Sequence, residues 1–330
     1  MKGNTFGKNF KLTTFGESHG REVGAIIQGI PAGISISITE IQKELNRRKP
    51  GKSSLESSRK EPDKLELISG IKKGKTTGRK IKLQVKNIDK HSEEYNEIIK
   101  KPRPSHADLT YFQKFGRIPI GGGRSSGRET IGRVIGGSIA KQILSKNGIE
   151  IKSKIIEING KKQDFEQTIL KAKENFDSVG GIVEIVATGV HPGLGEPVFD
   201  KLDADIAKAL MSIGGVKGVE IGAGFESAKM KGSENNDPIT IKDKIILTKT
   251  NNAGGILGGI SNGMPIIVRI AVKPTSSIGK EQDTIDIDSM KETKIRVKGR
   301  HDPCICPRIL PVAESMVALA IIDHLLYKKI

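Results

Sequence analysis

The stretch SGRETIGRVIGGSIAKQIL, residues 126–144, decides the fold. Its recurring apolar residues predict a helix from about Ser126 to Leu144. Gly132, Gly136 and Gly137 each destabilise a helix interior by about 1 kcal/mol relative to alanine. A packing reason must outweigh this loss, so the sequence predicts a helix that another element approaches closely.

Apolar periodicity predicts β-strands on both sides of this helix and further helices around it. The expected strands are 10–15, 22–30, 65–71, 81–85, 181–190 and 265–272, and the further helices are 39–48, 203–211 and 311–326. Thr39 is expected to cap the first of these helices. Pro311 is expected to open the last helix, which is apolar on nearly every face and therefore buried.

The polar stretch 52–63 is expected to form an exposed or ligand-covering loop. Repeats, low-complexity tracts and convincing linkers are absent from the sequence. One composite domain over residues 1–330 is therefore expected.

The formal net charge of +17 requires an explanation, because such a charge often marks nucleic-acid binding. The 41 lysines are spread along the chain, whereas the 14 arginines gather in a few segments rich in glycine, proline and histidine. Because a guanidinium suits bidentate recognition of phosphate and carboxylate, these clusters indicate a site for a small, multiply charged anion. RNA binding is the alternative, weakened by an aromatic content of only 4%.

The location and the cysteines can also be predicted. Without an apolar run of about 20 residues or a secretory leader, the chain is expected to be cytoplasmic. The two cysteines, Cys304 and Cys306, are too close for an easy disulfide and too few for a zinc site. They are expected to be reduced, structural thiols, and no metal site is expected.

Gly16-Glu17-Ser18-His19-Gly20 matches the nucleophile elbow of serine hydrolases. That elbow needs a helix after it and an oxyanion loop earlier in the chain, whereas here a β-like segment follows and only about fifteen residues precede. A hydrolase is therefore disfavoured. A histidine in this tight turn could instead exchange protons near neutral pH, or could be structural.

Arg103-Pro104-Ser105-His106-Ala107-Asp108 holds an arginine and a histidine on a proline-stiffened segment. The arginine can hold an anion while the histidine protonates a leaving oxygen. Asp108 could cap the following turn or orient the imidazole.

Residues 121–130, GGGRSSGRET, combine three glycines with a helix start. The glycines let the backbone approach a ligand, and one of the two serines can cap the helix so that its first N–H groups face an anion. Arg124, Arg128 and Arg133 add positive charge. The segment is neither a P-loop nor a dinucleotide fingerprint, and the alternative to anion binding is an arginine-rich helix start paired with surface carboxylates.

Two further segments near the C-terminus carry chemistry. Lys273-Pro274-Thr275-Ser276-Ser277 offers a cation and three hydroxyls, and Gly299-Arg300-His301-Asp302-Pro303 places three functional side chains in a row. Consecutive residues of an extended segment point to opposite sides, so at most two of those three should face one ligand. His91, His191 and His324 stand apart from these motifs, and a surface or packing role is expected for each.

In this order, the five motifs resemble the chorismate synthase family. Residues 193–197 and 251–261 are also typical of that family, so the resemblance covers essentially the whole chain. It implies an α+β fold, a layered β-α-β sandwich, usually assembled as a homotetramer. It also implies a shikimate-pathway lyase that eliminates phosphate and a ring proton, in an anti-1,4 sense, from 5-enolpyruvylshikimate 3-phosphate. The product is chorismate, and reduced FMN is required without net redox change.

The resemblance implies roles for particular residues. His106 would protonate the departing phosphate, His19 would act on the protonation state of the reduced flavin, and Asp302 would work with flavin N5 in removing the ring proton. The residues implied in binding the anionic groups of the substrate are Arg48, Arg103 and Arg128. The residues implied in binding FMN are Arg124, Ser125, Ser126, Gly214, Gly215, Gly258, Lys273, Pro274, Thr275, Ser276, Ser277 and Arg300.

Some positions depart from the family pattern. They are Ser54 for a common arginine, Gly214 and Gly215 for a bulkier pair, a segment 117–120 that is one residue short, and Ser105 for glycine. Lys52 or Arg59 could substitute for the missing arginine. None of these changes removes a proposed catalytic side chain. Within this family, the single domain over residues 1–330 implies that there is no appended flavin reductase domain, so a separate source of reduced FMN is expected. NADP is also associated with the family, but no residue of this chain is implied in its binding.

Overall fold

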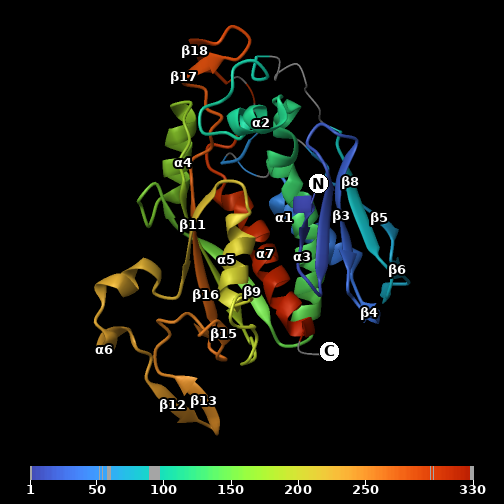
Figure 1. The fold of residues 1–330 in the computed structure, drawn as a ribbon, viewed down its shortest axis with the longest axis vertical. Coiled ribbons are helices and arrows are strands. Elements are labelled where there is room, and N and C mark those ends of the chain that lie inside the picture. Colours follow the sequence, from blue (N-terminus) through green and yellow to red (C-terminus); the bar gives the residue numbers. More distant parts are fainter. Residues whose placement is uncertain are drawn as a thin grey trace.

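Two antiparallel sheets lie on opposite sides of a layer of helices (Figure 1). The structure is a computed structural model that describes residues 2–51, 53, 55–57, 61–88, 97–297, 299 and 301–327. The first sheet has the order β1 (Thr5–Phe6), β2 (Lys11–Gly16), β3 (Glu22–Gln28), β8 (Ile81–Lys86), β5 (Leu65–Ser69). The second sheet has the order β11 (Val216–Ile221), β16 (Ile266–Val272), β10 (Gly181–Thr188), β9 (Glu150–Ile158). The helices between them are α1 (Ile38–Arg48), α3 (Thr130–Ser145), α5 (Leu202–Met211) and α7 (Cys306–Tyr327).

This arrangement confirms the predicted α+β sandwich. The smaller elements surround it: α2 (Asp108–Phe115), α4 (Phe165–Glu174), α6 (Gly232–Asn235), β4 (Ala32–Ser35), β6 (Ile71–Lys72), β7 (Lys75–Thr77), β12 (Ile239–Lys242), β13 (Ile245–Thr248), β14 (Ile256–Leu257), β15 (Ile260–Ser261), β17 (Glu281–Asp286) and β18 (Lys291–Arg296).

The glycines of α3 lie where two other layers touch the helix. A Cβ on Gly132 would be 2.6 Å from the carbonyl oxygen of Gly24 in β3. One on Gly136 would be 2.6 Å from Leu12 Cδ1 in β2, and one on Gly137 would be 2.1 Å from Ser315 Cβ in α7. The predicted close approach is therefore confirmed, and α3 packs against the first sheet and α7 at once.

Helix α7 is the core helix. It is long and apolar enough to cross a membrane, but 83% of its most apolar window is buried inside the protein. Its Asp323 carboxylate accepts hydrogen bonds from the backbone N–H groups of Lys8, Asn9 and Phe10 at 2.6–3.0 Å. The C-terminal helix therefore fixes the start of the first sheet.

Three helix starts differ from the prediction. Helix α1 is capped by Ser37, whose extended backbone lets its hydroxyl accept from Glu40 N at 3.2 Å, and not by Thr39, which already lies in the first turn. Helix α3 begins at Thr130, because Ser126 caps a preceding 3₁₀ turn. Helix α7 begins at Cys306, so Pro311 lies inside it. A proline there removes one helical hydrogen bond, and the burial of nearly the whole helix outweighs that loss.

A buried ionic cluster joins three helices to the second sheet. Glu314 of α7 accepts from Arg47 of α1 at 2.7 and 2.8 Å, from Lys141 of α3 at 2.8 Å and from Ser153 of β9 at 2.8 Å. Burial by itself would raise the pKa of Glu314, but the two cations outweigh it and lower the pKa to about 2. The carboxylate therefore stabilises the folded state in its charged form.

Glu314→Gln is expected to lower the free energy of unfolding by about 3 kcal/mol at pH 7, because one pKa unit corresponds to about 1.4 kcal/mol. The folded-state pKa lies below the ordinary value of 4.5. The contribution is therefore complete well above that value and is lost as the pH falls toward 2. Urea unfolding of both proteins checks this: their difference should shrink by more than half between pH 7 and about pH 3. An equal difference at both pH values would contradict the account.

Candidate active site

A cavity of about 530 Å³ opens at the end of the helical layer where α1 ends and α3 and α7 begin. The positive ends of two helix dipoles therefore point toward it. Its lining residues with charged or hydroxyl side chains include six arginines of the described chain. The six arginines are Arg48, Arg103, Arg124, Arg128, Arg133 and Arg308. The other charged, histidine or hydroxyl side chains in the lining are Lys273, His106, His301, Glu129, Asp302, Ser57, Ser105, Ser125, Ser126, Thr130, Ser212, Thr275, Ser276 and Ser277. The excess of fixed positive charge suits a ligand with several anionic groups.

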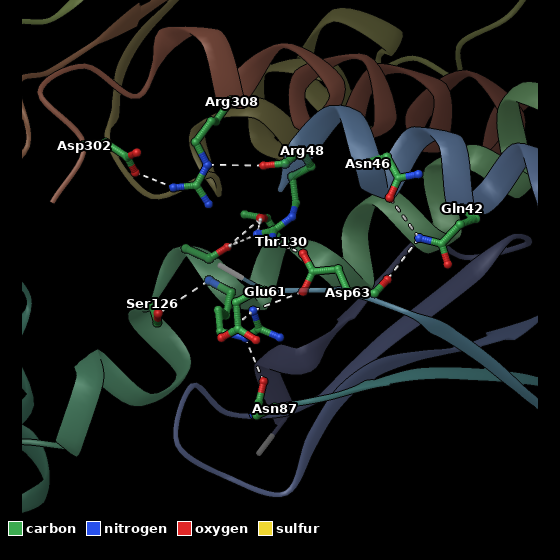
Figure 2. A network of polar contacts seen from close by, with 12 residues as sticks. Gln42, Asn46, Arg48, Glu61, Asp63, Asn87, Ser126, Thr130, Asp302 and Arg308 are labelled. Carbon is green, nitrogen blue, oxygen red and sulfur yellow. Dashed lines mark hydrogen bonds and ion pairs between the residues drawn. The ribbon is translucent and has the colours of Figure 1, made fainter. Parts of the chain in front are cut away.

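Asp63 forms ion pairs with both Arg48 and Arg128. Figure 2 shows Asp63 beside Arg48. One carboxylate oxygen of Asp63 accepts from Arg48 Nη2 at 2.7 Å and the other from Arg128 Nη1 at 3.1 Å. Burial by itself would raise the pKa of Asp63, but the two arginines outweigh it and hold the pKa below its ordinary value. Burial lowers the pKa of Arg48 to about 10, so Arg48 stays charged at neutral pH.

Each of these two arginines has one side-chain N–H group that donates to no described residue. Arg48 Nε and Arg128 Nη2 are buried and have no hydrogen-bond partner among the described residues. A buried charged donor without a partner is costly unless a ligand satisfies it. Both residues line the cavity, so an anion bound there can supply the missing acceptors.

His106 is supported from behind by a carboxylate. Its Nδ1 lies 2.6 Å from Asp108 Oδ1, and Arg103 binds the same carboxylate through Nε at 2.7 Å and Nη2 at 2.9 Å. Burial by itself would raise the pKa of Asp108, but the bonds from Arg103 and His106 hold the pKa well below its ordinary range. Because Asp108 is ionised, the Nδ1 of His106 carries a proton and Nε2 is left for exchange with a ligand.

The three consecutive glycines 121–123, which we call the triglycine turn, separate the two motif histidines. A Cβ on Gly121 would be 2.1 Å from His19 Cδ2, and one on Gly122 would be 3.4 Å from His106 Cε1. All three glycines have positive φ, which an L side chain rarely adopts. Glycine is therefore needed for the turn, and at Gly121 also for the room that the His19 ring occupies, whereas a Cβ on Gly122 would make only an ordinary contact with His106.

The run 273–277 meets the segment around Ser105. Lys273 Nζ and Ser276 Oγ both donate to the carbonyl oxygen of Ser105, at 2.5 and 2.8 Å. Ser105 has φ +58°, which explains why glycine is usual at this position in the family that the sequence resembles. Partial burial, with Lys217 nearby, lowers the pKa of Lys273 from its ordinary value.

Asp302 faces the cavity with both of its oxygens engaged. Oδ1 accepts from the backbone N–H of Ser57 at 2.9 Å, and Oδ2 forms an ion pair with Arg308. Arg308 also donates from Nε to the carbonyl oxygen of Arg48 at 3.2 Å (Figure 2). The loop before β5, the end of α1 and the start of α7 are thereby tied together.

Most of the predicted site residues therefore lie together. Those that line the cavity are Arg48, Arg103, His106, Arg124, Ser125, Ser126, Arg128, Gly214, Gly215, Lys273, Pro274, Thr275, Ser276, Ser277 and Asp302. His19 lies behind the lining residue Gly121 rather than in the lining itself. The predictions for Arg300, for Ser54 with its substitutes Lys52 and Arg59, and for His91 fall outside the described residues.

Gly258 does not lie with the others. It forms the turn between β14 and β15, and the neighbouring Gly259 accepts from Leu202 N at the start of α5. The other end of α5 leads to Gly214 and Gly215 in the cavity wall. A helix of 10 residues places these ends about 15 Å apart.

Other predictions can also be compared with the structure. The stretch 52–63 was predicted to be an exposed or ligand-covering loop. Among its described residues Ser53 and Pro62 are exposed, whereas Ser57, Glu61 and Asp63 are buried because they bond to the site. Ser57 lines the cavity, which agrees with the ligand-covering alternative rather than with an exposed loop. Cys304 and Cys306 are free and buried, as expected. His324 is buried against Asp205 at 2.9 Å, in the packing role expected for it.

Asp63, Asn87 and Arg308 are functional candidates that sequence reasoning missed. Each stands outside the five motifs, and its partners come from distant parts of the chain. Arg308 lies six residues beyond Asp302. A search for charged residues shortly after the motif at 299–303 would therefore have found it. Among the residues that the structure describes, no three His, Cys, Asp or Glu side chains are grouped to hold a metal ion.

The chain is similar in sequence to chorismate synthases over nearly its whole length. The model of the family described as chorismate synthase matches residues 10–326. Chorismate synthase from Methanococcoides burtonii is 53% identical over 353 residues, covering 99% of this chain and 96% of that relative. The one from Methanocaldococcus jannaschii is 49% identical, covering 97% and 95%. A crystal structure of chorismate synthase matches with a TM-score of 0.75 at 31% identity, covering 98% of this chain and 93% of that one. The family model, the relatives and the fold agree: the chain belongs to the chorismate synthase family of lyases.

Proposed function

We propose that this protein converts 5-enolpyruvylshikimate 3-phosphate to chorismate in the 530 Å³ cavity, with reduced FMN bound beside the substrate. Family membership supplies the reaction. One observation carries the proposal. The same cavity is lined by His106, which is hydrogen-bonded to Asp108, and by Arg48 and Arg128, each of which has a buried N–H donor without a partner among the described residues.

The substrate carries a phosphate and two carboxylates, and these would be held by arginine. Arg48 would bind an anionic group through Nε, and Arg128 would bind one through Nη2. Arg103, which lies beside His106, would also bind an anionic group of the substrate. Fixed guanidinium groups bind an anion without having to be ordered first. Asp63 and Asp108 would keep these groups in place.

His106 would serve as general acid. Its Nε2, when protonated, would give a proton to the phosphate oxygen as the carbon–oxygen bond breaks. The ionised Asp108 stabilises the protonated imidazole through its contact with Nδ1. The proton on Nε2 would then be transferred to the departing phosphate. The electron pair of the ring C–H bond would form one new double bond, the existing ring double bond would shift toward the carbon that bears the phosphate, and the carbon–oxygen electron pair would leave with the phosphate. Asp302 would take part in removing the ring proton.

The residues implied in flavin binding suit a phosphate-bearing ligand. Gly214 and Gly215 let the backbone approach closely, Ser125 and Ser126 stand just before a helix start, and the run 273–277 adds a cation and hydroxyls. Reduced FMN, when bound there, would supply electron density that promotes the loss of phosphate. His19, behind the triglycine turn, would hold a proton near that ligand.

We also propose that the protein assembles as a homotetramer in the cytoplasm. Large apolar side chains are exposed to solvent on β12, on β13 and on the segment before α5. At least 68% of each is exposed in Ile239, Ile241, Ile246, Val198 and Phe199. Gly258 could then contact the flavin of a neighbouring copy, since its own cavity lies at the other end of α5. Sedimentation velocity would contradict this if the protein stayed at the mass of one chain.

The reaction type can be tested by product stoichiometry. With dithionite-reduced FMN and anaerobic conditions, phosphate and chorismate should appear in equal amounts. Phosphate without chorismate would identify a hydrolase instead, and binding of RNA without binding of substrate or flavin would revive the nucleic-acid alternative.

A further inference from the structure

Asn87 lies just after β8, outside the cavity lining, and connects two parts of the site (Figure 2). Its side-chain oxygen accepts from Arg128 Nε at 2.7 Å. Its side-chain nitrogen donates to the carbonyl oxygens of Glu17 at 2.9 Å and Gly20 at 3.0 Å. The residue is only 7% exposed, so water does not compete strongly for these bonds.

The chemistry of the partners fixes the orientation of the amide. An arginine Nε can only donate, and backbone carbonyl oxygens can only accept. The oxygen must therefore face Arg128 and the nitrogen must face residues 17 and 20. Aspartate has no donor on that second side when ionised, and alanine reaches neither side.

The two carbonyl groups that Asn87 holds are the ends of the turn that carries His19. Gly20 N donates to Glu17 O at 3.0 Å and closes this turn, and Ser18 N donates to Gly123 O at 3.4 Å. Gly121, in the same triglycine turn, lies directly against the His19 ring. The position of His19 therefore depends on what holds residues 17–20 in place.

The Arg128 guanidinium is fixed from two sides. Asn87 accepts from Nε, and Asp63 and Glu61 each lie 3.1 Å from Nη1. Only Nη2 is then left without a partner among the described residues. Asn87 thus determines which donor of Arg128 is presented to the cavity.

We propose that Asn87 is a positioning residue that holds the His19 turn and the Arg128 guanidinium in a fixed relation. This inference deepens the proposed function and rests on it. A single buried amide would make the flavin-side histidine and the substrate-side arginine parts of one rigid unit. Preorganisation of this kind matters because a displacement of about 1 Å can reduce a rate by about 10²-fold.

Asn87→Ala should remove both connections. Hydrogen exchange of the amides of residues 18–21 should become at least about tenfold faster, since their turn loses its anchor. Substrate affinity, measured by calorimetry without flavin, should fall by about fivefold or more as Arg128 loses one of its supports. Asn147→Ala, just beyond the far end of α3, is the matched change of an amide that bonds a backbone carbonyl, and it should alter neither measurement.

Asn87→Asp separates the two connections. The carboxylate can still accept from Arg128, but it cannot donate to residues 17 and 20, so their exchange should quicken as it does in the alanine variant. If one variant fails to fold, the other still tests the turn. Unchanged exchange in a folded variant would overturn the proposal.

A double-mutant cycle with His19→Ala provides the kinetic test. If Asn87 acts on turnover through His19, adding Asn87→Ala to His19→Ala should lower kcat by no more than about threefold beyond His19→Ala. Multiplicative losses would overturn the coupling. An inactive wild type would count against the proposed function alone, because exchange and substrate affinity are measured without turnover.

Discussion

His106→Ala is expected to lower kcat by about 10² or more, the usual scale of a lost general acid. The reason is the pairing of His106 Nδ1 with Asp108 at 2.6 Å, which leaves Nε2 available for the proposed transfer of a proton to the leaving phosphate. Steady-state rates of chorismate formation with saturating reduced FMN would measure the loss. Activity within a few-fold of the wild type would refute the assigned role.

Asp108→Asn is the companion variant. It keeps the imidazole but removes the negative charge that stabilises its protonated form, so kcat should fall by about tenfold or more. Substrate affinity needs separate measurement, because Arg103 bonds the same carboxylate and would lose an ionic partner.

Gly121→Ala is the second change for which a large effect is expected. The new Cβ would lie 2.1 Å from His19 Cδ2, and the backbone has φ +63°, so both the ring and the triglycine turn must move. A loss of about 10²-fold in kcat is expected from this displacement. The left-handed backbone should also lower the free energy of unfolding by about 1–2 kcal/mol.

Gly232→Ala is the matched control, because its Cβ would have nothing within 4 Å and the residue lies in α6, away from the cavity lining. Rates and urea unfolding of both variants, side by side with the wild type, separate the two effects. Near-normal kcat in Gly121→Ala would show that His19 and the triglycine turn do not determine the rate.

Much of the fold could be predicted because strand and helix periods are local. The apolar and β-branched residues of 10–15 and 22–30 predicted the strand pair β2 and β3, and the glycines of α3 correctly required a close neighbour. The identity of that neighbour could not be predicted. Gly137 meets Ser315, which is nearly 180 residues away in the chain, and no local pattern encodes such a contact.

The site divides in the same way. Motif residues such as His106 and Arg128 could be named because chemistry concentrates them in short segments. The residues that hold Arg128, namely Asp63 and Asn87, are single polar side chains outside the motifs, and only the tertiary structure brings them to it. For the same reason the sequence could not decide between an exposed and a ligand-covering loop at 52–63, because the burial of Glu61 and Asp63 depends on pairing with distant arginines.

The most direct test of the account is turnover at limiting flavin. Purified protein should be supplied anaerobically with excess 5-enolpyruvylshikimate 3-phosphate and a small amount of pre-reduced FMN, with no further reductant. The account predicts many chorismate molecules per flavin, equal phosphate release and flavin that remains reduced at the end. No chorismate from folded protein, or product limited to one molecule per flavin, would contradict it.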